Sequence, residues 1–205
     1  MGVVISLSER KLEKLINHEA SELHGCDIHK LMKYADALKS INPNNSFLHL
    51  AQGILYAKYT DPHDRSYVQS VWHLSQFINS HPYHADAVWW RLDSATSIVS
   101  GTPYTKTLSR LAKEAVKFFP ENICILNAAY HAFRDGVCDY REAIKVGVRI
   151  LSLYPDDYEI RSQIKVMEGL CKDERAAIKP YLVRYKKGRP KVLKLRGVCF
   201  DNKKN

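Results

Sequence analysis

The chain has 205 residues, of which 45% are hydrophobic and 26% are charged. This length suffices for one domain with a hydrophobic core, and the composition is that of a folded protein rather than a disordered one. No apolar run reaches the roughly 18 residues that a membrane-spanning helix needs, and we expect no signal peptide. The five cysteines are odd in number and form no CxxC pair, so we expect a reducing, cytoplasmic setting without disulfides.

The net charge of +9 is concentrated near the C-terminus. Residues 1–170 carry 19 basic and 19 acidic side chains, whereas residues 171–205 carry twelve basic and three acidic ones. The sequence therefore predicts a neutral folded body, 1–170, followed by a basic C-terminal segment, 171–205.

Residues 1–170 are predicted to be helical, because apolar residues recur three or four positions apart and no segment alternates like a strand. A capping-box pattern at Ser6 and Glu9 and capping residues at Asp27, Asp61 and Thr102 mark helix starts. The expected helices are a first one ending at Gly25, a second from Asp27 to Pro43, and then Phe47–Tyr59, Pro62–Pro82, Ala85–Ser100, Pro103–Pro120, Ile123–Arg134, Tyr140–Leu153 and Ile160–Leu170.

Prolines recur at a nearly constant interval along this series of helices. Pro43, Pro82, Pro120 and Pro155 are 39, 38 and 35 residues apart, and each follows the second helix of a predicted pair. A period slightly above 34 residues with two helices per period is typical of solenoids built from helical hairpins.

The chain resembles the tetratricopeptide repeat family over about Asp27 to Leu170. That family has small and aromatic residues in its first helix, an alanine in its second and a proline after it. Residues at such positions here are Gly53, Tyr56, Ala112, Ala115, Ala128, Ala129, Ala132 and Ala143. Asp93 departs from the pattern, because a small residue is expected there. The resemblance implies an all-α fold, a right-handed superhelix of stacked antiparallel helix pairs. The alternative is an irregular helical bundle.

The same resemblance implies a concave surface, lined by the first helices, that holds a protein or peptide segment. The candidate partner-binding residues are Tyr56, Trp90, Asp93 and Tyr130. Trp89 and Trp90 point about 100° apart on a helix, so one can enter the core while the other faces a partner, although both can also be structural. The expected core aromatic residues are Trp89, Phe118, Phe119, Tyr130 and Phe133.

Motifs for catalysis or cofactor binding are not apparent. The sequence has no glycine-rich phosphate loop, no GxSxG and no HExxH. His24, Cys26, Asp27 and His29 surround a helix break, but their spacing fits no structural zinc site. We therefore expect a non-enzymatic protein without a metal or cofactor.

The basic segment is the most distinctive part of the sequence. Seven bases and no acid occur within 184–196, namely Arg184, Lys186, Lys187, Arg189, Lys191, Lys194 and Arg196. Residues 187–190, Lys-Gly-Arg-Pro, resemble the core of AT-hook minor-groove binders, with lysine at the first basic position. Apolar residues are interleaved with the bases. Binding to nucleic acid, binding to an acidic protein or membrane surface, and packing on the fold all remain open.

The N-terminal residues 1–6 also fit an N-myristoylation pattern, with Ser6 as a helix cap being the alternative. Taken together, the sequence predicts a cytoplasmic adaptor, chaperone or regulator that binds a protein segment on a helical repeat array. The alternative hypothesis is a nucleic-acid-associated regulator that contacts phosphates through the basic segment.

Overall fold

A computed structural model describes residues 8–23, 25–58, 66–98 and 104–186, with side chains described as far as Lys172. Every regular element in these residues is a helix, which confirms the all-α prediction for the described part of the chain. The elements are α1 (Glu9–Ser21), α2 (Ile28–Ile41), α3 (Phe47–Lys58), α4 (Ser66–Ser80), α5 (Ala85–Ser97), α6 (Thr105–Phe118), α7 (Ile123–His131), the π-helical segment η1 (Ala132–Val137), α8 (Tyr140–Leu153) and α9 (Tyr158–Lys186).

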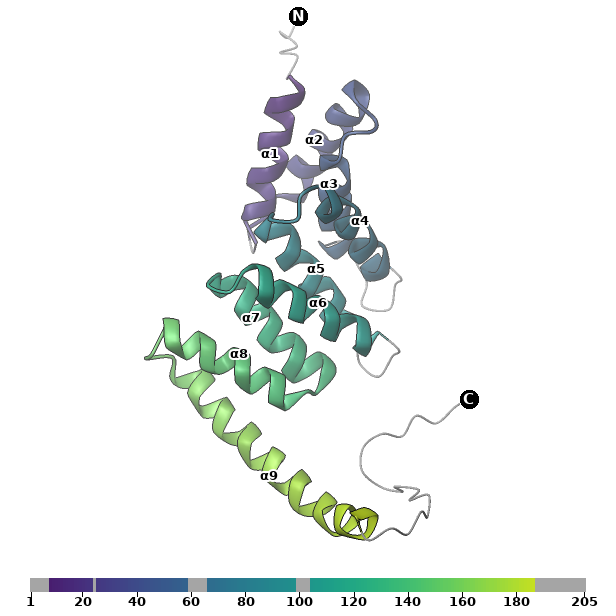
Figure 1. Ribbon diagram of the computed structural model, residues 1–205. Coiled ribbons are helices and arrows are strands. Elements are labelled where there is room, and N and C mark those ends of the chain that lie inside the picture. Colours follow the sequence, from purple (N-terminus) through teal and green to yellow (C-terminus); the bar gives the residue numbers. More distant parts are fainter. Residues whose placement is uncertain (1–7, 24, 59–65, 99–103, 187–205) are drawn as a thin grey trace, which may run out of the picture.

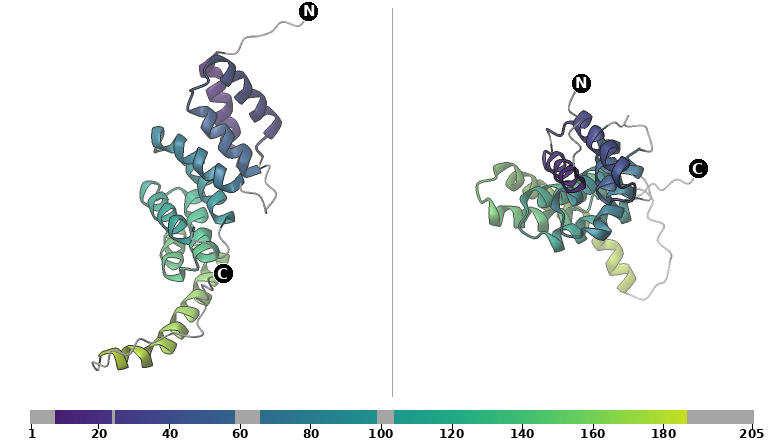
Figure 2. Two further views of the ribbon diagram at one scale, coloured as in Figure 1. Left: turned by 90° about the vertical axis from the view of Figure 1, so that its right-hand side faces the viewer. Right: turned by 90° about the horizontal axis from the view of Figure 1, so that it is seen from above.

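The helices form an elongated stack in which each one packs against the next along the chain (Figure 1). In addition, α1 packs on α3, α3 on α5 and α5 on α7, so that these four helices form one continuous row. We call it the first-helix row. Helices α2, α4, α6 and α8 flank this row without extensive contacts to one another in the described residues. Two further views show the same succession, with α9 projecting beyond α8 at one end (Figure 2).

The four periodic prolines occupy equivalent places in the stack. Pro43, Pro82, Pro120 and Pro155 each lie two residues beyond the last residue of α2, α4, α6 and α8, respectively. Proline has no backbone N–H and its ring clashes with the preceding turn of a helix, so it is suited to a position just past a helix end. The regular spacing of the four prolines in the sequence therefore reflects the regular spacing of the helix ends.

Side-chain caps begin several of the helices. Asp27 accepts a hydrogen bond from the backbone N–H of Lys30 (3.1 Å), as its position in the sequence predicted. Asn122 and Asp139 cap α7 and α8 in the same way. The predicted caps Ser6, Asp61 and Thr102 lie outside the described residues.

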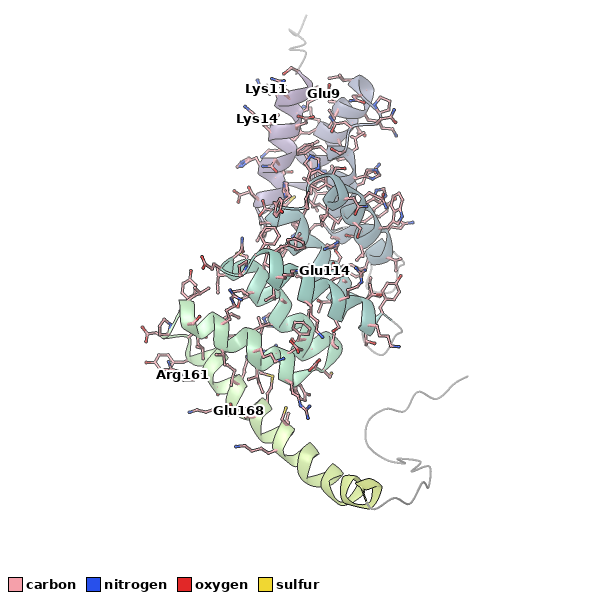
Figure 3. All side chains as sticks on the ribbon, viewed as in Figure 1. Glu9, Lys11, Lys14, Glu114, Arg161 and Glu168 are labelled. Atoms are coloured by element: carbon pink, nitrogen blue, oxygen red, sulfur yellow. The ribbon has the colours of Figure 1, made fainter. Side chains whose placement is uncertain are left out.

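Glu9 ties α1 to the turn between α2 and α3. Its carboxylate accepts hydrogen bonds from the side-chain amides of Asn42 (2.7 Å) and Asn45 (2.8 Å). These bonds lower the pKa of Glu9, the one from Asn42 most. Lys11 and Lys14 lie on the other side of α1 (Figure 3).

Helices α3 and α4 approach closely at a glycine. A Cβ atom on Gly53 would lie 2.5 Å from Cγ of Leu74, so no larger residue fits unless Leu74 shifts. Ser70 donates a hydrogen bond to the carbonyl of Gly53 (2.7 Å), and its hydroxyl lies 2.8 Å from that of Ser94 on α5. This buried polar chain joins three successive helices.

One continuous core runs along the stack, and Trp90 is its largest fully buried side chain. Its indole N–H donates a hydrogen bond to the carbonyl of Ala20 (2.9 Å), which fixes α5 against the end of α1. Tyr130 and Phe133 are also buried, as predicted. Phe118 is 49% exposed, so its assignment to the core was wrong.

The end of the seventh helix differs from the sequence prediction. The helix does not stop before Gly136 but continues as the π-helical η1 to Val137, and the left-handed residue after it is Cys138 (φ 57°). Gly136 lies close to α6 instead, because a Cβ atom there would come within 2.5 Å of Cδ2 of Leu108, whose side chain would have to shift.

Helix α9 is longer than predicted. It begins at Tyr158 and runs to Lys186, so the expected boundary between residues 170 and 171 falls inside one helix. Among the described helices, none combines the length and the apolar character that crossing a membrane requires.

Candidate functional site: the surface of the first-helix row

The structure places the four predicted partner-binding residues in different surroundings. Tyr56 on α3 is 36% exposed, and Asp93 on α5 is exposed. Trp90 is only 2% exposed and Tyr130 is fully buried. Two of the four residues therefore belong to the core in this structure, and two remain on the surface.

The structure reverses the roles that we expected for the two adjacent tryptophans. Trp90 faces α1 and the core, whereas Trp89, which was expected in the core, is half-buried and lines a surface hollow. Their rings meet edge to face with centroids 5.0 Å apart. The sequence established that the two side chains diverge, but the rotation of α5 against α1 decides which one is buried.

Tyr130 is a structural link between α7 and α9. Its hydroxyl donates a hydrogen bond to the side-chain oxygen of Gln163 (2.9 Å), and the guanidinium of Arg134 lies 5.4 Å from the centre of its ring. These contacts use both the ring and the hydroxyl within the fold, so Tyr130 lies in the core of this structure and not on the surface where the sequence analysis expected a partner.

Trp89 lines a hollow of about 320 Å³ on the first-helix row, which we call the Trp89 hollow. Its walls come from Leu23 in the turn after α1, from α5 and from α7, three segments that the chain separates widely. The lining residues are Leu23, Trp89, Asp93, Thr96, Cys124, Asn127, Ala128 and His131. The predicted residue Asp93 is thus brought together with an aromatic ring, a thiol, an amide and an imidazole.

The α5 contribution to this hollow follows from helix geometry. Trp89, Asp93 and Thr96 are separated by four and three positions, so they lie along one stripe of the helix. Sequence analysis missed Cys124, Asn127 and His131, because only folding shows that α7 packs beside α5.

A small charged network lies beside the hollow. His131 Nδ1 is 3.1 Å from a carboxylate oxygen of Asp135, and the Arg134 guanidinium donates two hydrogen bonds to the same carboxylate (2.6 and 2.7 Å). The bonds from Arg134, followed by the one from His131, lower the pKa of Asp135. The network therefore holds a carboxylate in its charged form next to the hollow.

Tyr56 belongs to a separate aromatic cluster on α3 and α4. Its ring stacks on that of His73 with centroids 5.5 Å apart, and the Nδ1 atoms of His73 and His49 are 3.0 Å apart. Trp72 packs edge to face on His73 (4.7 Å) and is 54% exposed. Burial, and then the charge of His49, lowers the pKa of His73. Tyr56 and the Trp89 hollow are thus not one site.

The basic segment lies mostly outside the described residues. Arg184 and Lys186 fall in the last turn of α9, and Lys187, Arg189, Lys191, Lys194 and Arg196 lie beyond the part of the chain that the structure describes. Residues 1–6, which match the myristoylation pattern, lie outside it as well.

The described residues bring no metal-binding group together. No cluster of three or more His, Cys, Asp and Glu side chains within them is placed to hold a metal ion. Cys26 is half-buried, and burial, with Glu19 as the next cause, raises its pKa to about 11. At neutral pH this thiol is protonated, and a protonated thiol is a weak nucleophile. Comparisons with protein families, with curated proteins and with solved structures find no match to this chain.

Proposed function

We propose that the chain is a non-enzymatic binding scaffold, a tetratricopeptide-like right-handed superhelix, that holds a segment of a partner protein on the first-helix row. The observation that carries the proposal is the Trp89 hollow, which two members of that row, α5 and α7, build together with Leu23 from the turn after α1. A groove assembled from successive first helices is suited to an extended or helical segment that runs along them.

The packing of the helices indicates on which side the stack is concave. The first helices α1, α3, α5 and α7 contact one another in turn, whereas their flanking helices do not do so extensively in the described residues. A stack whose members meet closely on one side and spread on the other is concave on the close side. The Trp89 hollow is lined by α5 and α7 of this row, so a partner bound there would contact more than one helix.

The chemistry of the hollow indicates what kind of segment fits. The half-buried ring of Trp89 offers apolar area, and tryptophan is enriched among the residues that dominate binding energy. The Asp93 carboxylate supplies negative charge at the same place. We therefore propose a partner segment with an apolar anchor side chain next to a lysine, an arginine or another hydrogen-bond donor.

The experiment selects peptides from a random library on the immobilised full-length chain and measures their affinity by fluorescence anisotropy. Trp89→Ala should weaken binding about 30-fold, as expected for a hot spot of roughly 2 kcal/mol. The matched control is Trp72→Ala, because Trp72 is exposed on α4 outside the hollow. Equal loss in both variants, or no loss in Trp89→Ala, would contradict the assignment of the hollow.

A second candidate function is nucleic-acid binding through the basic segment. It is supported by seven bases without an acid in 184–196 and by the projection of α9 away from the stack (Figure 1). Four to six phosphate contacts would lower affinity for duplex DNA on the order of a few hundredfold or more between 50 and 200 mM salt.

Anisotropy titrations with labelled A·T-rich and G·C-rich duplexes test this candidate. Truncation after Lys186 should abolish most of the binding and leave the helical signal in circular dichroism unchanged. Arg189→Ala should reduce any preference for A·T-rich duplex, whereas Lys194→Ala should weaken both duplexes alike. If neither duplex binds at 50 mM salt, this candidate function is wrong.

A further inference from the structure

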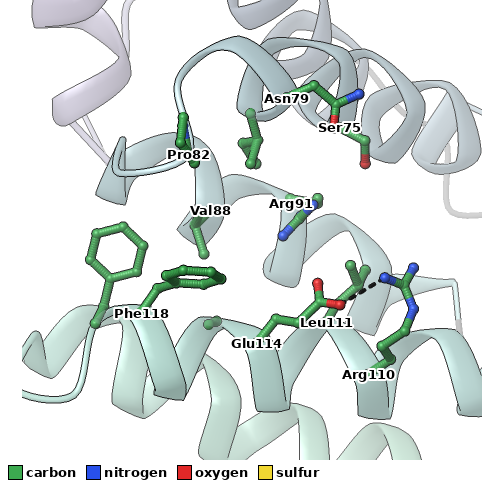
Figure 4. A pocket seen from close by; sticks show the side chains of 12 residues that line it. Ser75, Asn79, Pro82, Val88, Arg91, Arg110, Leu111, Glu114 and Phe118 are labelled. Carbon is green, nitrogen blue, oxygen red and sulfur yellow. Dashed lines mark hydrogen bonds and ion pairs between the residues drawn. The ribbon is translucent and has the colours of Figure 1, made fainter.

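A second hollow lies between α4, α5 and α6 (Figure 4). It shares no lining residue with the Trp89 hollow. We call it the Arg91 hollow, and its volume is about 390 Å³. One part of its wall is apolar and includes Val88, Phe118 and Phe119, while the other part includes Arg91, Arg110 and Glu114. On α5, Arg91 points nearly opposite to the stripe that carries Trp89 and Asp93, and Val88 points about 100° away from Trp89.

Arg91 is a buried charge that makes no hydrogen bond or ion pair in the described part of the chain, although the charge of the nearby Glu114 acts on it. The residue is 8% exposed, its Nε atom has no hydrogen-bond acceptor, and none of the carboxylates described lies within ion-pair distance of its guanidinium. Burial lowers its pKa. Removing a guanidinium from water is costly unless an anion or several acceptors replace the water, so this side chain is placed to receive a ligand.

The neighbouring charges do not neutralise Arg91. Glu114 is already paired with Arg110, whose Nη1 lies 2.8 Å from its carboxylate oxygen. The two arginines and one glutamate give the wall of the hollow a net positive charge. Figure 4 shows Arg91 reaching from α5 into the space between α4 and α6, with the paired Arg110 and Glu114 on the opposite wall.

We propose that the Arg91 hollow binds a carboxylate that is attached to an apolar body. The planar guanidinium of Arg91 would form two parallel hydrogen bonds with the carboxylate, a geometry that arginine matches well. The apolar body would lie against Val88, Phe118 and Phe119. A single unpaired guanidinium offers one positive charge, which suits a monocarboxylate better than a phosphate dianion.

The size of the hollow agrees with this ligand class. Small-molecule sites have volumes of roughly 300–1,000 Å³ and contain a few polar groups that fix orientation. The same chemistry could come from a free organic acid or from a carboxylate within a protein segment. The proposal does not depend on the proposed function, because the two hollows share no lining residue.

The experiment uses the full chain and isothermal titration calorimetry. The probes are 3-phenylpropionate and a short peptide ending in phenylalanine with a free carboxylate, each compared with its uncharged amide. We expect at least one acid to bind about tenfold or more tightly than its amide, because the amide lacks the charge that Arg91 would meet. Binding by 3-phenylpropionate identifies a free acid as sufficient, whereas binding by the peptide alone identifies a protein segment as the source.

Two variants test the role of Arg91 against a purely structural one. Arg91→Met should lose about tenfold or more in acid affinity, while the midpoint of thermal unfolding without ligand stays unchanged or rises, because a buried unpaired charge has been removed. Arg149→Met, which alters an exposed arginine on α8, is the matched control and should bind like the wild type.

Glu114→Gln provides a second variant that does not disturb the core, because Glu114 is only half-buried. Removing its negative charge should strengthen acid binding severalfold, since the ligand carboxylate would no longer be repelled and Arg110 would be released. The proposal is overturned if no acid binds more tightly than its amide, if Arg91→Met binds like the wild type, or if Glu114→Gln weakens binding.

Discussion

The two hollows beside α5 show opposite chemistry on one short helix. The Trp89 hollow combines a half-buried aromatic ring with an exposed carboxylate on the first-helix row. The Arg91 hollow combines a buried cation with apolar walls in the gap between α4 and α6. Both depend on how α5 is rotated in the stack, and Trp90 fixes that rotation through its hydrogen bond to Ala20. A helical stack can thus present two different binding surfaces from one helix, provided that the helix is anchored.

The largest effect is expected when this anchor is removed. Trp90→Ala should lower the free energy of unfolding by about 3–5 kcal/mol, the usual cost of deleting a large buried aromatic side chain. Urea denaturation followed by circular dichroism measures the loss. Because both hollows share α5, peptide and acid binding should weaken together.

The control for this experiment is Trp72→Ala, whose side chain is mostly exposed. It should change the free energy of unfolding by less than about 0.5 kcal/mol. A Trp90→Ala variant that loses one binding activity and keeps the other would show that the two hollows do not depend on a common anchor.

Measuring both ligands on both variants should show whether the two hollows act independently. Trp89→Ala should reduce peptide affinity about 30-fold and leave binding of 3-phenylpropionate within about twofold. Arg91→Met should show the reverse pattern. Anisotropy and calorimetry on the same preparations provide both affinities, and loss of both activities in Trp89→Ala would mean that the hollows are coupled or that the variant is misfolded.

A smaller effect is expected at Tyr130, which we place in the structural link to α9. Tyr130→Phe keeps the buried ring and removes the hydrogen bond to Gln163, so the free energy of unfolding should fall by about 1 kcal/mol. Peptide affinity should not change. A clear loss of peptide binding without loss of stability would show that Tyr130 contacts the partner.

The smallest effect concerns pH, through the residue that caps α5. His84 Nδ1 accepts a hydrogen bond from the backbone N–H of Ala87 (3.2 Å), which requires the neutral ring with its proton on Nε2, the atom that faces the side-chain oxygen of Asn17. Burial lowers the pKa of His84 below the ordinary value near 6.5. The unfolded chain therefore binds the proton first, and stability falls as pH decreases from about 6.5 toward the folded-state pKa.

Unfolding measured in urea between pH 7 and pH 5 tests this dependence. His84→Asn keeps a good capping side chain and removes the titrating group. The free energy of unfolding should therefore fall less steeply with decreasing pH in this variant. His73, whose pKa is also lowered by burial, accounts for a further part. An unchanged slope in His84→Asn would show that the cap does not titrate in this range.

Helix positions were predictable because their signals are local. Capping by Asp27 and the four prolines depend only on neighbouring residues, and the structure places them where the sequence indicated. The length of α9 was not predictable in this way, because the change in charge after residue 170 was taken as a boundary, whereas the helix continues through Gly169 and past residue 171.

The candidate sites were less accessible from sequence because they depend on rotation and packing. Trp89 and Trp90 could be assigned different roles, but the choice between them required the position of α1 against α5. The burial of Arg91 could not be predicted from the sequence, because an arginine in a helix is usually solvated and only the packing of α4 and α6 buries it.

Photo-crosslinking tests the central claim, partner binding on the first-helix row, most directly. Benzoylphenylalanine replaces either Cys124, an exposed residue of the Trp89 hollow, or Asn79, an exposed residue of the Arg91 hollow. Each protein is irradiated with a selected, labelled peptide, and the crosslinked product is quantified by mass spectrometry. We predict a strong crosslink from position 124 and little from position 79. A crosslink from position 79 alone, or from neither position at saturating peptide, would contradict the account.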